Sequence, residues 1–171
     1  EYFTAEPPMR IYPLRDKVRI LDSLGVDNFL CLKFDSSLAN MAPAAFTNDI
    51  LISHLGVKHL AVGDDFRFGK KRQGDFALLQ EIGEQNDMQV VETATVIQQD
   101  QRVSSTRIRQ ALQDGDITTA NKLLGHSYQL SGRVRAGDKR GRTIGFPTVN
   151  LKLPEHIAPH CGVYAVRVYG L

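Results

Sequence analysis

The chain has 171 residues, 42% of them apolar and 23% charged, which is ordinary for a soluble globular protein. Its 21 Lys and Arg against 19 Asp and Glu give a net charge of +2, which disfavours a nucleic-acid coat protein and a polybasic membrane binder. Neither a run of about 18 apolar residues nor an apolar signal core is present. We therefore expect no membrane partner, and we predict a cytoplasmic protein with two reduced cysteines.

Taken in chain order, roughly the first 110 residues after a proline-rich loop alternate between helical and extended patterns. Predicted helices cover 14–25, 43–56, 74–85, 104–115 and 116–125. Predicted buried strands cover 26–34, 58–63 and 88–97. This alternation favours an α/β fold, in which a parallel sheet is covered by helices on both faces.

The pattern changes at Tyr128. The segments 128–136 and 162–170 alternate with a period of two, which is typical of half-buried strands. About 45 residues with two or three strands cannot close a barrel. We therefore expect a boundary near 124–128, followed by only the start of a small β domain, in a sequence that is cut at its C-terminal end.

The first motif with chemical potential is VGDDFRFGKKRQGD, at 62–75. An apolar strand ends at Gly63, and ligands of open α/β sheets bind at the carboxyl ends of strands. Phe66 and Phe68 would then wall a planar ring, while the basic residues at 70–72 would neutralise phosphate. A solvated basic turn with both phenylalanines in the core is an equally good interpretation of this segment alone.

The second motif is SSTRIR, at 104–109. Three hydroxyl residues open a predicted helix, so N–H groups, hydroxyls and the positive end of the helix dipole favour an anion there. Arg109 lies one turn further along and would reach the same anion. Plain capping by Ser104 or Ser105 is the favoured alternative for this segment by itself.

The third motif is GRVRAGDKRGRTIGFPTVN, at 132–150. Its recurring glycines would let backbone amides approach a polyphosphate closely. Thr148 and Asn150 alternate with Val149, so both project from one face of an extended segment. Their oxygens suit Mg²⁺ that carries nucleotide phosphates. A glycine-rich β loop with solvated arginines remains an open alternative.

In this order and spacing, GDDFRFG, SSTRIR and GRTIGFPTVN resemble the motifs of the prokaryotic bifunctional riboflavin kinase/FMN adenylyltransferases (FAD synthetases). The likeness extends over nearly the whole chain, including PLRDKVRILDSLGVD and LGHSYQLSGRV. It implies that 1–124 is a Rossmann-like FMN adenylyltransferase domain that lacks its first strand and helix. It implies that 125–171 is the N-terminal part of a riboflavin kinase β-barrel domain.

The resemblance also implies a transferase that phosphorylates riboflavin to FMN and adenylylates FMN to FAD, with Mg²⁺ and ATP. By similarity, the adenylyltransferase site takes nucleotide and flavin with Gly63, Asp65, Phe66, Phe68, Ser105, Thr106 and Arg109. By similarity, the kinase site takes nucleotide with Gly137, Arg142, Gly145, Thr148 and Asn150, of which Thr148 and Asn150 would also serve the metal. The family's HxGH-type signature and the kinase carboxylate match nothing here, so no catalytic residue is expected within this segment.

Two other classes of function remain open from the residues. A different nucleotidyltransferase, related to the pantetheine-phosphate or glycerol-phosphate enzymes, would explain SSTRIR but not GFPTVN and its β domain. A binding module without turnover would take a nucleotide or flavin, or RNA through the basic runs at 67–72 and 133–142. A near-neutral charge and the absence of an aromatic-interleaved motif count against nucleic acid. The pattern does not predict an oligomeric state.

Overall fold

The computed structural model describes residues 8–137, 140–143, 145, 146, 148–152 and 158–170. The chain divides into two compact units. Leu30–Arg102 belongs to the first unit, and the described residues of Glu6–Phe29 and Val103–Leu171 belong to the second. Among the residues described, no helix has the length and apolar character to cross a membrane. The domain boundary expected between residues 124 and 125 stays a prediction.

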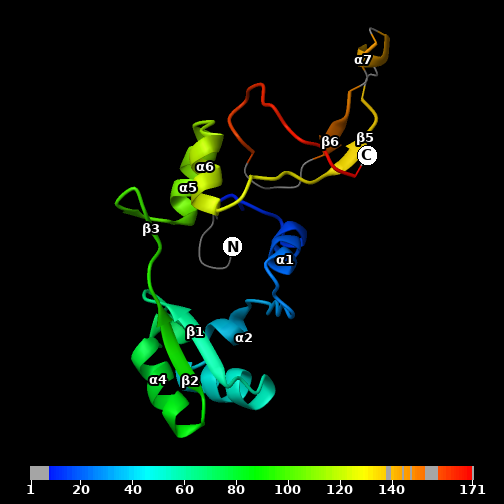
Figure 1. Ribbon diagram of the computed structural model, residues 1–171. Coiled ribbons are helices and arrows are strands. Elements are labelled where there is room, and N and C mark those ends of the chain that lie inside the picture. The colour runs from blue at the N-terminus through cyan, green and yellow to red at the C-terminus, as the bar shows by residue number, and fades with distance from the viewer. Residues whose placement is uncertain (1–7, 138–139, 144, 147, 153–157, 171) are drawn as a thin grey trace. The chain divides into compact units, whose positions relative to one another are not determined.

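A parallel pair of strands forms the sheet of the first unit (Figure 1). β1 (His59–Gly63) pairs with β2 (Gln89–Thr93), with Gly63 opposite Thr93. Both strands therefore end at the same edge, where the loops that follow them start. The pairing confirms the parallel arrangement predicted from the alternation of helices and apolar strands.

The helix α4 (Phe76–Gln85) connects these strands and packs beside β2 (Figure 1). It begins at Asp75, whose carboxylate accepts a hydrogen bond of 3.1 Å from the N–H of Leu78. A Cβ at Gly83 would lie 2.5 Å from the carbonyl oxygen of Met88, so glycine permits the helix to approach the chain that leads into β2. The helix predicted for this segment is confirmed.

The helix predicted over 43–56 is present in a wider form. A single turn, α3 (Pro43–Ala45), leads into a π-helix, η1 (Phe46–His54). At its end the N–H of Leu55 donates to the carbonyl of Ile50, five residues earlier, over 3.0 Å. The apolar spacing predicts a helix here, but it does not distinguish a five-residue from a four-residue hydrogen-bond interval.

The helices of the second unit are α1 (Leu14–Ser23), α5 (Ser105–Gln113) and α6 (Ile117–Leu124). α5 and α6 pack against each other through a core of five buried residues: Ile108, Ala111, Leu112, Ala120 and Leu123. Asp116 caps α6, and Gly125 ends it in the left-handed conformation at φ 76°. All three helices are confirmed as predicted.

The remaining elements are short. They are α2 (Ser36–Ala39), η2 (Lys70–Arg72), β3 (Ile97–Gln98), β4 (Gln101–Arg102), β5 (Arg133–Arg135), α7 (Arg140–Thr143) and β6 (Asn150–Lys152). β3 pairs with β4, and β5 pairs with β6, both in the antiparallel sense. The β5–β6 ladder lies in the region where the sequence predicts a β domain. The barrel of which it would be the start stays a prediction.

Two strand predictions are wrong. The segments 26–34 and 162–170 form no strand, and every residue in both is exposed. Leu30 is 56% exposed and Val166 is 73% exposed. A strand exists through hydrogen bonds to a neighbouring strand, and no described strand pairs with either segment. Apolar runs and alternation report which side chains suit burial, but not whether a partner is present.

Candidate functional site

The first candidate cluster is the loop that follows β1, at residues 63–74. It starts with a turn in which the N–H of Phe66 donates to the carbonyl of Gly63 over 3.0 Å. Phe68 and Gly74 then exchange two backbone hydrogen bonds, of 3.1 and 2.9 Å, which close the loop. A Cβ at Gly74 would lie 2.6 Å from the Phe68 ring, so the closure depends on this glycine. The loop is therefore closed by backbone hydrogen bonds, and its basic residues at 70–72 are exposed, as the interpretation of the segment as a solvated basic turn predicts.

Two adjacent carboxylates stand at the start of this loop. Asp65 accepts from the Arg102 guanidinium at 2.6 Å, and Asp64 accepts from the Thr95 hydroxyl at 2.6 Å. Arg102 belongs to β4, and Thr95 follows β2, so the carboxyl ends of both sheet strands contribute. These partners lie 37 and 31 residues away along the chain, and no spacing in the sequence predicts them.

The two phenylalanines of the loop have different environments. Phe68 is 7% exposed and packs in a core with Val62 and Leu79. Phe66 is half-buried and stacks on Phe68, with ring centroids 5.5 Å apart and an interplanar angle of 17°. The interpretation that places both phenylalanines in the core therefore holds for Phe68. The partly exposed ring of Phe66 is the one that can cover a planar ligand.

The second candidate cluster is the start of α5. Ser104 is the N-cap residue, and its hydroxyl accepts from the N–H of Arg107 over 3.3 Å. Ser105 and Thr106, in the first turn, are exposed and thus accessible to an anion. The Nε atom of Arg109, one turn further, donates to the carbonyl of Met9 over 2.8 Å. This hydrogen bond holds the guanidinium against the chain that precedes α1.

A buried polar cluster lies beside α1 in the same unit. The Asp16 carboxylate is buried and accepts from the Ser131 hydroxyl at 2.6 and 2.7 Å, and Arg15 donates to that hydroxyl oxygen at 2.5 Å. The Tyr12 ring lies 5.6 Å from that of Tyr128. Burial raises the pKa of Tyr12 to about 12 and raises the pKa of Tyr128 as well. Sequence reasoning missed this cluster, since its parts are more than a hundred residues apart.

The third candidate cluster is the glycine-rich segment between β5 and β6. The N–H of Phe146 donates to the carbonyl of Gly141 over 2.8 Å, and a Cβ at Gly141 would lie 2.9 Å from Cγ2 of Thr148. The side-chain amide of Asn150 occupies the space in which a Cβ of Gly137 would stand. The glycines therefore let the backbone approach the two predicted metal-binding side chains, Thr148 and Asn150, closely.

The predicted residues thus fall into three groups. Gly63, Asp65, Phe66 and Phe68 lie together in the first unit. Ser105, Thr106 and Arg109 lie together in the second, so the two halves of the predicted adenylyltransferase site belong to different units. Gly137, Thr148 and Asn150 lie together beside β6, while Arg142 lies in α7 and Gly145 follows it with φ 81°. Within the described residues, no group of three or more His, Cys, Asp or Glu is placed to hold a metal ion.

Two family models match successive parts of the chain. A family model described as FAD synthetase matches residues 1–107, and one described as riboflavin kinase matches residues 124–171. Because the first match covers more than half of the chain, the chain belongs to the FAD synthetase family. The resemblance inferred from the motifs is thereby confirmed.

Individual relatives are named for both a riboflavin kinase and an FMN adenylyltransferase. The bifunctional riboflavin kinase/FMN adenylyltransferase of Escherichia coli (strain K12) is 48% identical over 170 residues, which cover 99% of this chain and 54% of that protein. The protein of the same name from Haemophilus influenzae is 44% identical over 169 residues, which cover 98% of this chain and 55% of that protein. The chain therefore spans about half the length of these relatives.

A solved structure also matches the fold. A crystal structure described as a macrolide-efflux protein from Streptococcus pneumoniae aligns with a TM-score of 0.80 and 33% identity. The alignment covers 94% of this chain and 53% of that one. The arrangement of helices and strands is thus shared with a larger solved protein.

Proposed function

We propose that the full-length protein containing this chain makes FMN from riboflavin and ATP, and FAD from FMN and ATP. One observation carries the proposal: a single chain matches the FAD synthetase model and then the riboflavin kinase model, in that order. Two of the clusters support it: the start of α5 offers hydroxyls and an arginine, and the segment between β5 and β6 offers glycine backbone, groups that suit an anionic ligand. The substrates are accordingly small molecules, ATP and flavins.

In the adenylyltransferase reaction, an FMN phosphate oxygen attacks the α-phosphorus of ATP in line, and pyrophosphate leaves. Positioning and charge neutralisation do most of the catalytic work in such a transfer. The N–H groups and hydroxyls of Ser105 and Thr106 would hold the ATP phosphates, with Arg109 adding a fixed positive charge. The ring of Phe66 and the loop of Gly63 and Asp65 would bind the nucleotide or the flavin.

In the kinase reaction, the riboflavin 5′-hydroxyl attacks the γ-phosphorus of ATP, and ADP leaves. The Gly137–Gly145 segment, which includes Arg142, would cover the phosphates, and Gly137 already accommodates the amide of Asn150. Thr148 and Asn150 supply a hydroxyl and an amide oxygen, which are the hard oxygen donors that Mg²⁺ takes beside substrate phosphates. Mg²⁺, when bound there, would neutralise charge on the transferred phosphoryl group.

The proposal is tested by supplying the full-length gene product with riboflavin or FMN and Mg-ATP and separating the flavins by chromatography. We expect FMN and FAD from riboflavin, and FAD with pyrophosphate from FMN. A folded protein that forms neither product would contradict the proposal. Pyrophosphate release without any flavin requirement would instead support another nucleotidyltransferase. The cytoplasmic location stays a prediction.

A further inference from the structure

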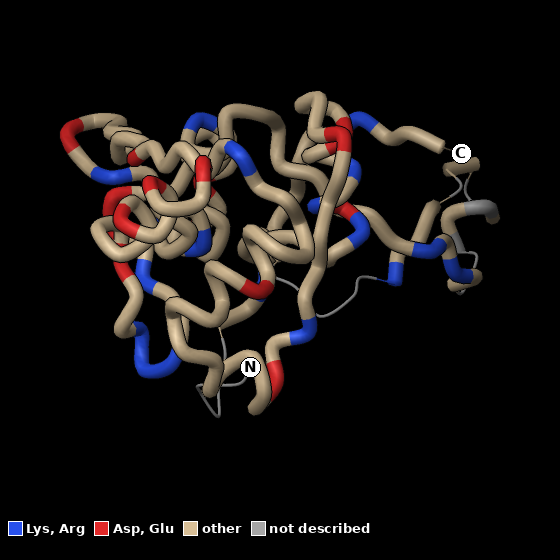
Figure 2. Tube along the Cα trace, turned by 90° about the horizontal axis from the view of Figure 1, so that it is seen from below, with Lys and Arg blue, Asp and Glu red and all other residues tan. Residues whose placement is uncertain are grey.

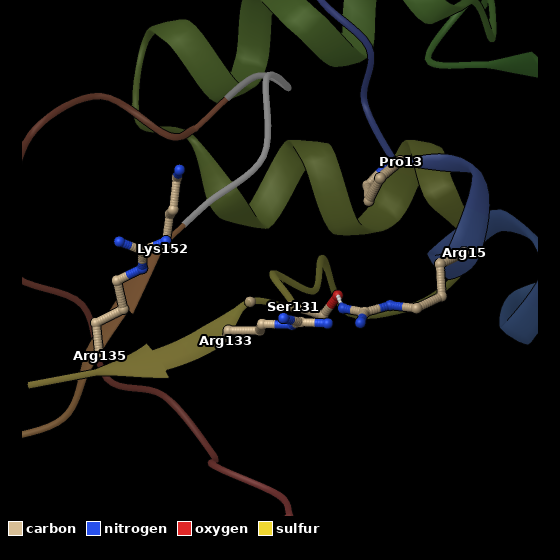
Figure 3. Close-up of a pocket in the computed structure, with 7 residues that line it drawn as sticks. Pro13, Arg15, Ser131, Arg133, Arg135 and Lys152 are labelled. Atoms are coloured by element: carbon tan, nitrogen blue, oxygen red, sulfur yellow. Dashed lines mark hydrogen bonds between the residues drawn. The ribbon is translucent and has the colours of Figure 1, made fainter.

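The stretch that leads from α6 into β5 is held against the start of α1 by a buried carboxylate. The Ser131 hydroxyl donates to Asp16, whose two carboxylate oxygens lie 2.6 and 2.7 Å away. Arg15 donates to the same hydroxyl oxygen at 2.5 Å (Figure 3). The Asp16 side chain is buried, so water does not readily replace this contact. We call these three residues, Arg15, Asp16 and Ser131, the Asp16 anchor.

Two arginines of α1 also lie near the Asp16 carboxylate. Arg15 Nε is 3.7 Å and the Arg19 guanidinium is 3.9 Å from one of its oxygens. Ion pairs of exposed arginines at such distances stabilise a protein little. Both arginines belong to the helix that carries Asp16, so Ser131 is the partner through which Asp16 holds a different part of the chain.

A second contact joins the same two stretches. The Tyr12 ring, which precedes α1, lies 5.9 Å from the His126 ring and 5.6 Å from the Tyr128 ring. The N–H of Tyr128 in turn donates to the side-chain oxygen of Asn121 in α6 over 2.6 Å. The chain between α6 and β5 is thus held at two places, and the Asp16 anchor is the one nearer to β5.

The Asp16 anchor crosses from one family match to the other. Arg15 and Asp16 lie in the part that the FAD synthetase model matches, and Ser131 lies in the part that the riboflavin kinase model matches. All three residues belong to the second compact unit. One matched part of the chain therefore holds the start of the other.

The β5–β6 ladder connects the Asp16 anchor to a candidate kinase residue. β5 begins two residues after Ser131, and a Cβ at Gly132 would lie 2.6 Å from the carbonyl oxygen of Lys152, so the anchored chain packs closely against the end of β6. At the other end of the ladder, Arg135 pairs with Asn150. Two residues of a strand span about 7 Å. Asn150 therefore lies only a short way along the ladder from the anchored end.

The ladder has little stability of its own. A two-stranded sheet is marginally stable in water, and the charged side chains of β5 and β6 are all positive: Arg133, Arg135 and Lys152 (Figure 2). Arg133 stands directly opposite Lys152, and like charges in that position destabilise an antiparallel pair. A hydrogen bond to the buried carboxylate of Asp16 therefore contributes to holding the ladder in one position.

We propose that Asp16, acting through Ser131, is a positioning residue for the riboflavin kinase reaction. Its role is to fix the start of β5, and with it the place of Asn150. The inference rests on the proposed kinase activity, and it goes beyond that proposal because Asp16 comes from the part that matches FAD synthetase. A displacement of about 1 Å at a reacting centre can lower a rate by about 10²-fold, so release of the Asp16 anchor should affect the chemical step.

The test is made on Ser131→Ala in the full-length gene product. We expect kcat for FMN formation to fall by about tenfold or more and the KM for riboflavin to stay within about twofold, because the geometry of phosphoryl transfer is disturbed. FAD formation from supplied FMN, measured on the same protein, should stay within about twofold. Ser131→Thr keeps a hydroxyl and should restore part of the kcat. Ser127→Ala is the matched control, because Ser127 is an exposed serine of the same stretch, and it should leave both activities within about twofold.

Two further measurements separate positioning from a general loss of stability. Asp16→Asn should lower the same kcat, and the double variant with Ser131→Ala should lose little more than the more damaging single variant, because both changes act on one contact. Amide hydrogen exchange at Arg133–Arg135 should become faster in Ser131→Ala and stay unchanged in Ser127→Ala.

A selective fall in FMN formation that Ser131→Thr partly reverses would support the inference. A Ser131→Ala variant with the kcat of an active wild type would overturn it. Equal falls in FMN and FAD formation would overturn it as well, since a loss of folded protein lowers both. A wild type that forms no FMN would instead contradict the proposed function, and the positioning role of Asp16 with it.

Discussion

The Tyr12 side chain is only 6% exposed, and its hydroxyl forms no hydrogen bond of good geometry among the described residues; the nearby Gln129 backbone offsets only part of the effect of burial on its pKa. A buried polar group of this kind destabilises the fold, because it loses its hydrogen bonds to water. The ring itself packs well, with the Tyr128 ring at 5.6 Å and the His126 ring at 5.9 Å. The aromatic body thus stabilises the second unit while the hydroxyl opposes it.

Replacing this hydroxyl with hydrogen should therefore stabilise the protein. We predict that Tyr12→Phe raises the free energy of unfolding by about 1 kcal/mol, measured by chemical denaturation near pH 7. Burial raises the pKa of Tyr12 to about 12, above that of an unfolded tyrosine, so the native state keeps a proton that the unfolded state loses. The wild type should lose stability from about pH 10 to 12, and the variant should lose less. A variant that is less stable than the wild type at pH 7 would contradict this account.

At the scale of elements, two like charges face each other across the ladder that β5 and β6 form. Arg133 and Lys152 face each other in β5 and β6, and no described acidic residue lies between them. We predict that Lys152→Glu raises the free energy of unfolding by about 0.2–1 kcal/mol, because a repulsive pair becomes an attractive one. Lys152→Gln, which only removes the repulsion, should give a smaller gain by thermal denaturation. Destabilisation by both variants would show that the lysine contributes to the fold in another way.

Whether a helix or strand could be predicted from the sequence depends on which interactions form it. α4, α5 and α6 were predictable because their caps and apolar spacing are local, and β1 and β2 because parallel strands are near-continuous apolar runs. The absence of strands at 26–34 and 162–170 was not predictable, because a strand also requires a pairing partner, and periodicity does not show whether one is present.

The same distinction applies to the candidate site. The hydroxyls at the start of α5 lie next to one another in the sequence, and Thr148 and Asn150 follow from a simple alternation. The pairing of Asp65 with Arg102 depends on where β4 lies relative to the end of β1, and no local pattern encodes it.

At the scale of the whole molecule, the two proposed phosphate chemistries belong to separate parts of one chain. We propose that the start of α5, with Arg109, serves adenylyl transfer and that the segment ending at Asn150 serves phosphorylation of riboflavin. The FAD synthetase match, at residues 1–107, contains Ser105 and Thr106 and ends two residues before Arg109, and the riboflavin kinase match, at residues 124–171, contains Asn150. If the assignment is right, each activity should depend on its own residues.

The most direct measurement compares Arg109→Gln and Asn150→Ala in the full-length gene product, following FMN formation from riboflavin and FAD formation from supplied FMN. Arg109→Gln should lower FAD formation by about 10²–10³-fold, because it removes the positive charge that would stabilise the leaving pyrophosphate, and leave FMN formation within about twofold. Asn150→Ala should do the reverse, and Arg109→Lys should restore part of the lost activity. Circular dichroism must show both variants folded. Folded variants that lower both activities equally, or neither, would contradict the account.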